Sequence, residues 1–253
     1  MMSLLGIARR LLKLRSCLLL LTLLGACALP VNTALRDWSR VAESAVTRPD
    51  AAEPARAIQQ ALSLYFHALG VLWDGAELSF DEPRFQALTR QVPDPAPAAA
   101  MLELGRALRA ASDEKPPRWL PRDNSGPAPA YEDRRLPDFI RDADAPVRRM
   151  LVALSAMTAP GEPPAAAATE GTSDPALRQA RIEQEADLAR QADRRRASAA
   201  GYIAALDQVA EAQAMLGARP GDIMQRSIEL RLRLAEDRLR RLQNDRLLSA
   251  TGS

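Results

Sequence analysis

Histidine and cysteine are almost missing from this chain of 253 residues, which has one histidine, His67, and two cysteines, Cys17 and Cys27. Zinc sites of the Cys/His type need several such ligands, so the sequence excludes them. A Ser-His-Asp triad would have to use His67, and no nucleophile-elbow motif is present to pair with it. Glycine-rich phosphate loops and the calcium-loop pattern are also absent. The sequence therefore predicts no catalytic site, no cofactor and no metal.

Aromatic residues are scarce too, at 4% of the chain. No segment alternates Val, Ile, Thr and aromatic residues as a half-buried strand does. Alanine, leucine, arginine, glutamate and glutamine dominate instead, and these residues favour helices. The predicted fold class is therefore all-α.

Long apolar segments are missing as well. The longest one extends from Cys17 to Ala26, directly after the bases Arg9, Arg10, Lys13 and Arg15. At about 10 residues it is well below the ~20 that a membrane-spanning helix needs. A basic segment followed by a short apolar core is typical of a secretory signal peptide. We therefore expect an export signal rather than a transmembrane anchor.

The end of this apolar core resembles the lipobox of bacterial lipoprotein precursors. Leu24 stands at the third position before Cys27, and the small residues Gly25 and Ala26 lie between them. In that family the signal is cleaved before the cysteine, its thiol becomes a thioether to diacylglycerol, and the new amine is acylated. Several acyl chains hold a protein firmly on a membrane. The resemblance implies a signal peptide at 1–26 and a lipid-attached tether at 27–33; the alternatives are an uncleaved signal anchor and an ordinary signal peptide.

Position 28 is Ala, not the Asp that retains well-studied lipoproteins of the family in the inner membrane, so the resemblance implies the outer membrane, facing the periplasm.

Cleavage before Cys27 would change the composition of the mature chain. Only Cys27 would remain, so no disulfide is expected to stabilise the fold. The 34 bases would fall by four to 30, against 32 acids. No basic footprint for nucleic acid would be left.

The segment 34–158 is predicted to be a domain of short helices. Amphipathic patterns predict helices at 33–46, 54–73, 98–111 and 147–157, a further helix that ends at 92, and a shorter one within 131–142. Proline-rich stretches separate several of them, and a break is expected at Asp144-Ala145-Pro146.

The segment 159–173 has no apolar residue larger than alanine and is predicted to be a linker. Ser173-Asp174-Pro175 is a strong helix start, and no further proline occurs before Pro220. Gly217 and Pro220 indicate a tight turn into a last helix that ends near Leu248, followed by a disordered tail at 249–253. The segment 174–248 thus forms the second predicted domain.

Apolar residues recur in alternating steps of three and four along both long helices, which is the heptad pattern. Since only about five residues join them, we expect an antiparallel, coiled-coil-like hairpin. Its predicted seam consists of Leu188, Tyr202, Leu206, Val209, Leu216, Ile228, Leu232, Leu239 and Leu242. The first helix outruns the second, and we expect the excess at 175–190 to pack on the N-terminal helices; the alternatives are that it stands free or meets a partner.

Together these patterns favour a non-enzymatic, membrane-anchored envelope lipoprotein that presents its hairpin to a protein partner. The alternative is an enzyme or small-molecule-binding protein with a pocket near Tyr65, His67 and Trp73, although the apolar surroundings of His67 favour a packed histidine. Arg190 and residues 194–196 form a basic patch that could meet acidic lipids or an acidic partner. Nearby acids favour an ordinary ion-paired helix surface instead.

Overall fold

The computed structural model describes residues 33–115, 135–158 and 175–251. The predicted signal peptide, the lipobox with Cys27, nearly all of the tether and the linker at 159–173 lie outside these residues. The described helices belong to a single compact unit.

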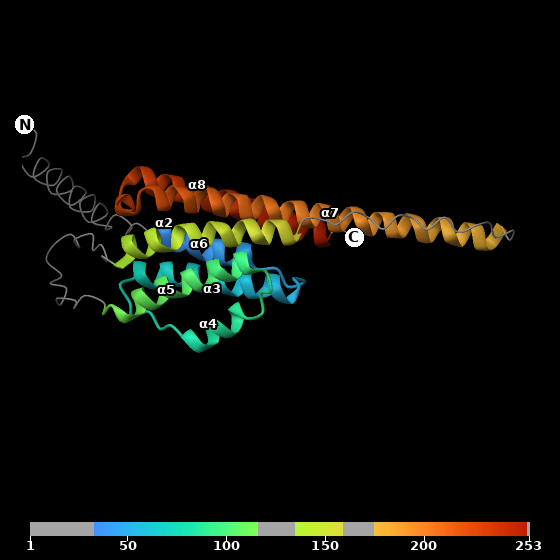
Figure 1. Cartoon of the computed structure of the whole chain (residues 1–253). Helices are drawn as coiled ribbons and strands as arrows, with labels where there is room; N and C mark the ends of the chain where they lie inside the picture. Colours follow the sequence, from blue (N-terminus) through green and yellow to red (C-terminus); the bar gives the residue numbers. More distant parts are fainter. Residues whose placement is uncertain (1–32, 116–134, 159–174, 252–253) are drawn as a thin grey trace, which may run out of the picture. The chain divides into compact units, whose positions relative to one another are not determined.

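Every regular element in the described residues is helical, which confirms the all-α prediction. The elements are α2 (Ala34–Val46), α3 (Glu53–Trp73), α4 (Glu82–Thr89), α5 (Pro95–Asp113), α6 (Arg135–Thr158), α7 (Pro175–Ala218), the 3-10 turn η1 (Pro220–Asp222) and α8 (Arg226–Thr251). In Figure 1, α7 and α8 lie along one side of α2, α3, α5 and α6, and the short α4 lies at the other side.

Two helix starts follow the expected capping chemistry. The side chain of Asp81 accepts a hydrogen bond of 3.1 Å from the amide of Arg84 at the start of α4. Asp94 does the same for the amide of Ala96 at 3.0 Å, so α5 begins at Pro95 rather than at residue 98. Proline is tolerated there because the first helical amides have no partner within the helix. The predicted proline-rich break is thus shorter than the sequence suggested.

The break predicted at Pro146 is wrong, since Pro146 lies inside the continuous helix α6. A proline within a helix loses one backbone hydrogen bond and costs about 3 kcal/mol. Pro146 is itself buried, on the same face as Ile140, Ala143, Val147 and Met150. Packing of this uninterrupted apolar face therefore outweighs the lost hydrogen bond.

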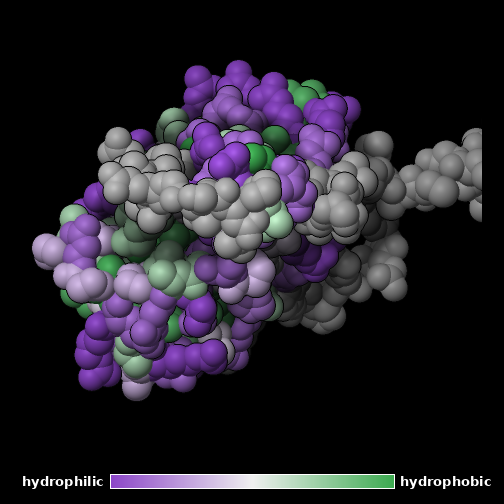
Figure 2. Space-filling model, turned by 90° about the vertical axis from the view of Figure 1, so that its right-hand side faces the viewer, coloured by the Kyte–Doolittle hydropathy of each residue, from purple (hydrophilic) through white to green (hydrophobic). Residues whose placement is uncertain are grey.

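The core of the unit is built around α3, which packs against α2 and α6. Phe66 of α3 meets Trp38 of α2 edge to face, with ring centroids 5.6 Å apart, and Tyr65 lies 5.4 Å from Phe139 of α6. These rings belong to one buried apolar cluster. Hydrophilic residues dominate the face of the protein seen in Figure 2.

The helices α7 and α8 share this core instead of forming a second one. They lie side by side and are joined at one end by η1 (Figure 1), and they also pack against α2 and α6. Tyr202, Leu206 and Leu239 belong to the same apolar cluster as Trp38 and Phe66. The predicted boundary at 159–173 therefore does not separate two cores, while coiled-coil pairing of α7 with α8 stays a prediction.

Two further expectations for the C-terminal helices need correction. Helix α8 continues to Thr251, into the predicted disordered tail. The packing of residues 175–190 on the N-terminal helices is not found among the described side chains of this range, none of which is buried: the first buried side chain of α7 among those described is Ala199. Helix α7 has 44 residues against 26 in α8, so its first part extends beyond the other helices in Figure 1. We call residues 178–198 the α7 arm.

Candidate interaction surface

The predicted lipid-attachment site lies just outside the described residues. Leu24, Gly25, Ala26 and Cys27 all precede Thr33, where the description begins. Ala34, the first residue of α2, is the seventh residue after Cys27. A fully extended chain of this length spans at most about 25 Å. A lipid on Cys27 would thus hold the start of α2 within this distance of a membrane.

Most of the predicted seam is inside the protein and cannot itself bind a partner. Tyr202, Leu206, Val209, Leu216, Ile228, Leu232 and Leu239 are buried, and Leu242 is partly buried against the same cluster. Leu188 is 56% exposed and does not belong to the seam, because it lies in the α7 arm beyond the other helices. The heptad pattern therefore identifies the inward face of α7 correctly only from Ala199 onward.

Gln213 occupies a polar position of the heptad pattern and is completely buried. Its Oε1 accepts a hydrogen bond of 2.8 Å from the hydroxyl of Tyr65 on α3. Its Nε2 donates to Oδ1 of Asp144 on α6 at 3.4 Å. Burial raises the pKa of the Tyr65 phenol far above its ordinary value. This hydrogen-bond chain links α7 to two helices of the N-terminal half.

Tyr202 makes a second polar attachment of α7. Its hydroxyl donates a hydrogen bond of 2.6 Å to the carbonyl oxygen of Val46 and accepts one of 3.1 Å from Nε2 of Gln59. The guanidinium of Arg48 lies 5.7 Å from the centroid of its ring, which is close enough for a cation–π interaction. The heptad pattern places Tyr202 in the seam but carries no signal for its hydroxyl partners, because they lie more than 140 positions earlier in the chain.

These contacts fix the direction of the arm relative to the start of α2. Gln59 pairs with Tyr202 and Tyr65 with Gln213, so α3 and α7 run in the same direction. Arg36, near the start of α2, pairs with Asp74 just after α3 at 3.4 Å. The start of α2 therefore lies near the end of α7. The arm lies at the opposite end and reaches about 36 Å beyond Tyr202 at 1.5 Å per residue.

The arm is exposed, charged and partly ion-paired. Along it, Arg181 pairs with Glu185 at 3.0 Å, Arg196 with Asp193 at 2.8 Å, and Arg190 with Asp187. Among the described residues, Arg194 and Arg195 have no ion-pair partner. The apolar side chains Ile182 and Leu188 are 54% and 56% exposed. The basic patch is thus partly neutralised, as the spacing of its acids predicts.

The described side chains named for the alternative pocket near His67 do not converge on one site. Tyr65 is fully buried, His67 is exposed and Trp73 is half-buried. Residues two apart on a helix point about 200° apart, so Tyr65 and His67 lie on opposite faces of α3. His67 is therefore not the packed histidine expected from its apolar neighbours.

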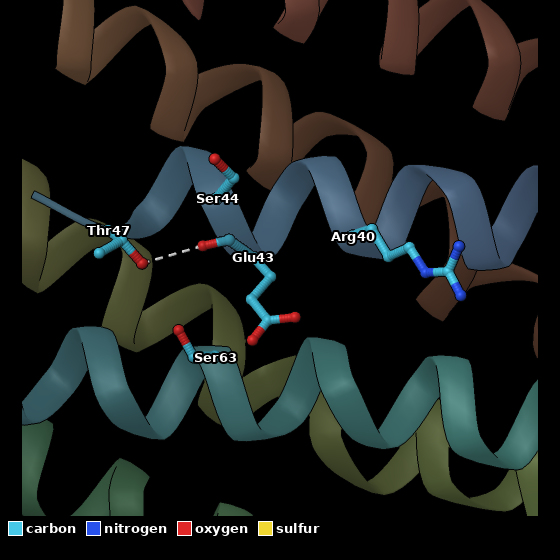
Figure 3. A pocket seen from close by; sticks show the side chains of 5 residues that line it. All are labelled: Arg40, Glu43, Ser44, Thr47 and Ser63. Atoms are coloured by element: carbon cyan, nitrogen blue, oxygen red, sulfur yellow. Dashed lines mark hydrogen bonds between the residues drawn. The ribbon is translucent and has the colours of Figure 1, made fainter.

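A shallow depression does occur between α2 and α3. It has a volume of about 500 Å³ and is lined by Arg40, Glu43, Ser44, Thr47 and Ser63. The Thr47 hydroxyl donates a 3.1 Å hydrogen bond to the carbonyl oxygen of Glu43, and Arg40 points away from the centre (Figure 3). Ligand sites are usually enclosed and lined by apolar and aromatic side chains. None of the five lining residues is apolar or aromatic, so we assign no ligand to the depression.

None of the described helices combines the length and the apolar character needed to cross a membrane. Within the same residues, no three His, Cys, Asp or Glu side chains are grouped so that they could hold a metal ion. Comparison of the chain with protein-family models, curated proteins and solved structures found no match.

Proposed function

We propose that this chain is a lipid-anchored envelope lipoprotein that acts as a non-enzymatic scaffold, with the α7 arm as its docking surface for a protein partner. The sequence supports the anchor through the lipobox at Leu24–Cys27. The observation that carries the docking role is the exposed arm, which continues a buried helix beyond the rest of the unit. The proposed membrane is the outer membrane, on its periplasmic side.

The arm is costly to keep as a helix without a partner. Isolated helices shorter than about 12–15 residues are marginal in water, and most helical stability in proteins comes from tertiary packing. In the arm, stabilisation comes from continuity with the buried part of α7 and from ion pairs such as Arg181–Glu185. Each such exposed pair contributes only about 0.3–0.5 kcal/mol. A helix maintained in this way, with exposed Ile182 and Leu188, suits recognition by another helix.

The position of the arm also suits docking. The start of α2 and the arm lie at opposite ends of α7, as the Arg36–Asp74 and Tyr202–Val46 contacts require. A lipid on Cys27 would hold the first end at the membrane and leave the second accessible. The anchor and the docking surface therefore do not compete for space.

Metabolic labelling with palmitate tests the anchor. We expect label to enter the wild-type chain and not the Cys27→Ser variant, because the diacylglycerol is attached to the thiol of Cys27, which serine lacks. Equal labelling of both chains, or none in the wild type, would overturn the lipoprotein assignment.

Cross-linking in intact cells tests the docking role. The double variant Ile182→Asp/Leu188→Asp should lose the cross-linked partner, because it places charge at the two large apolar side chains that the arm exposes. Val152→Asp is a matched control, since Val152 is 69% exposed but lies on α6. Partners that survive the arm variant, or that are lost equally in the control, would contradict docking on the arm.

A further inference from the structure

A pair of leucines lies uncovered on the outer face of α8. Leu230 and Leu234 are one helical turn apart and are 54% and 47% exposed. The inward face of the same helix holds the buried residues Ile228, Leu232 and Leu239. At the upper edge of Figure 2, the side on which α8 lies in Figure 1, hydrophobic residues occur among hydrophilic ones.

Arginines without ion-pair partners surround these leucines. Between residues 226 and 245, Arg233 pairs with Glu229 at 3.3 Å and Arg240 with Glu236 at 2.7 Å. The other arginines of this stretch, Arg226, Arg231, Arg238 and Arg241, are exposed and have no ion-pair partner in the described part of the chain.

Helical geometry places these residues on one surface. At 3.6 residues per turn, Leu230, Leu234, Arg238 and Arg241 follow one line along the helix, and Arg226 and Arg231 flank it. We call these six residues the α8 outer stripe. The exposed acids Asp237 and Asp245 lie within the same angular range of α8. The four arginines outnumber these two acids, so this surface keeps a net positive charge around Leu230 and Leu234.

This combination fits an anionic lipid surface better than a protein. Helices that lie in a membrane interface place leucines toward the acyl chains and arginines toward the head groups. Long arginine side chains can bury their methylene stems while the guanidinium stays at phosphate level. A stable protein interface buries about 800 Å² per partner. Two half-exposed leucines are too small an apolar centre for an interface of that size.

The proposed anchor would hold the stripe close to a bilayer. Helix α2 packs against α8, and Nε2 of Gln243 donates a 3.5 Å hydrogen bond to the carbonyl oxygen of Val41. Packed helices lie about 8–10 Å apart, and the chain from Cys27 to Ala34 can reach about 25 Å. The outer face of α8 is therefore within reach of the membrane that holds the lipid.

We propose that the α8 outer stripe lies on the anionic surface of the anchoring membrane. Leu230 and Leu234 meet the interface, and the arginines contact lipid phosphates. This inference rests on the lipid anchor of the proposed function and adds which face of the protein turns toward the bilayer. The α7 arm then extends beside the membrane, where it can meet a partner held in the same membrane.

The test measures how close α8 lies to the lipid. A nitroxide label at Leu234→Cys is introduced into the mature lipidated chain, and the protein is reconstituted in vesicles with or without phosphatidylglycerol. We expect accessibility to a water-soluble relaxation agent to fall at least severalfold in the anionic vesicles only. A label at Leu102→Cys, 51% exposed on α5, is the matched control and should not change. If the label at position 234 were equally accessible to the relaxation agent in both kinds of vesicle, the proposal would be overturned. An acidic protein would then be the better candidate for this face of α8.

A second measurement separates this proposal from the anchor itself. It uses a chain that starts at Ala28 and therefore carries no lipid on Cys27. This chain retains all of the described core, which begins at Ala34. Each basic residue near an anionic surface strengthens binding about fivefold, so Arg231→Gln/Arg238→Gln/Arg241→Gln should weaken vesicle binding by about 100-fold. Failure of palmitate labelling with retained, arginine-dependent vesicle binding would reject the anchor alone. Successful labelling with no effect of these arginines on binding or on accessibility would reject the stripe alone.

Discussion

The hydroxyl of Tyr65 on α3 donates a 2.8 Å hydrogen bond to Oε1 of Gln213 on α7, which lies 148 positions later in the chain. Both side chains are completely buried. A buried polar group is costly only when it has no partner, so the pair favours one register of α7 against α3. Because this pair fixes the position of α7 along α3, it also fixes where the exposed α7 arm begins.

Tyr65→Phe should lower the free energy of unfolding by about 1–3 kcal/mol, because Oε1 of Gln213 would stay buried without its donor. Urea unfolding followed by circular dichroism measures the change. The double variant Tyr65→Phe/Gln213→Leu should cost less than the sum of the two single variants, since it removes both polar groups together. Additive costs would show that the two side chains are not coupled.

Tyr65 also predicts how stability depends on alkaline pH. Burial raises the pKa of its phenol above the ordinary value of 10.0. Above about pH 10 the phenol ionises in the unfolded chain while it stays protonated in the folded one. The stabilisation is therefore fully present below about pH 10 and is lost above it, by up to about 1.4 kcal/mol per pH unit.

The measurement compares urea unfolding at about pH 9 and about pH 11, one unit on either side of the ordinary phenol pKa. We expect the wild-type chain to lose more stability between these values than Tyr65→Phe does. Identical losses in the two proteins would mean that the phenol is accessible to water in the folded state.

The same truncation should destabilise the protein strongly at one leucine of α7 and hardly at all at another. Leu206→Ala should destabilise by about 2–5 kcal/mol, because Leu206 is 1% exposed within the apolar cluster. Leu188→Ala should change the free energy of unfolding by less than about 0.5 kcal/mol, since Leu188 is 56% exposed. Thermal unfolding of both variants checks this contrast, and a large cost at Leu188 would place the arm inside a folded interface.

The same two leucines show how far the sequence determines the fold. Both fit the heptad pattern, which depends only on spacing and residue type. Spacing identifies one face of a helix, but whether anything covers that face depends on how far the neighbouring helices extend. Helix α8 is shorter than α7, and burial of α7 against its neighbours begins only after Ser198. Local sequence carries no signal for this difference.

The polar contacts of the core were equally invisible in the pattern. Gln213 interrupts the apolar heptad, and a buried polar residue in such a position indicates that a partner exists. The partner Tyr65 is itself a plausible core aromatic, and nothing local connects the two. The helix start at Pro175, by contrast, depends on residues only a few positions apart and is confirmed. The lipobox at Cys27 stays a prediction, and its consequences await the labelling experiment.

Gly217 predicts a steric effect on Asp144. A Cβ atom at Gly217 would overlap the carboxyl group of Asp144. That carboxylate pairs with Arg148 at 2.8 Å and accepts the hydrogen bond from Gln213, so it cannot move without losing partners. Gly217→Ala should therefore destabilise by about 1–3 kcal/mol, although alanine favours helices more than glycine does.

Gly70→Ala is the matched control, because a Cβ there would lie 3.6 Å from Oγ of Ser39, an ordinary contact. It should be neutral or stabilise by up to about 1 kcal/mol. The double variant Asp144→Ala/Gly217→Ala should destabilise by less than the sum of its two single changes, because the overlap is gone. Chemical unfolding measures the free energy of unfolding of these variants. If Gly217→Ala left it unchanged, α6 and α7 would not be held this close at their Asp144–Gly217 contact.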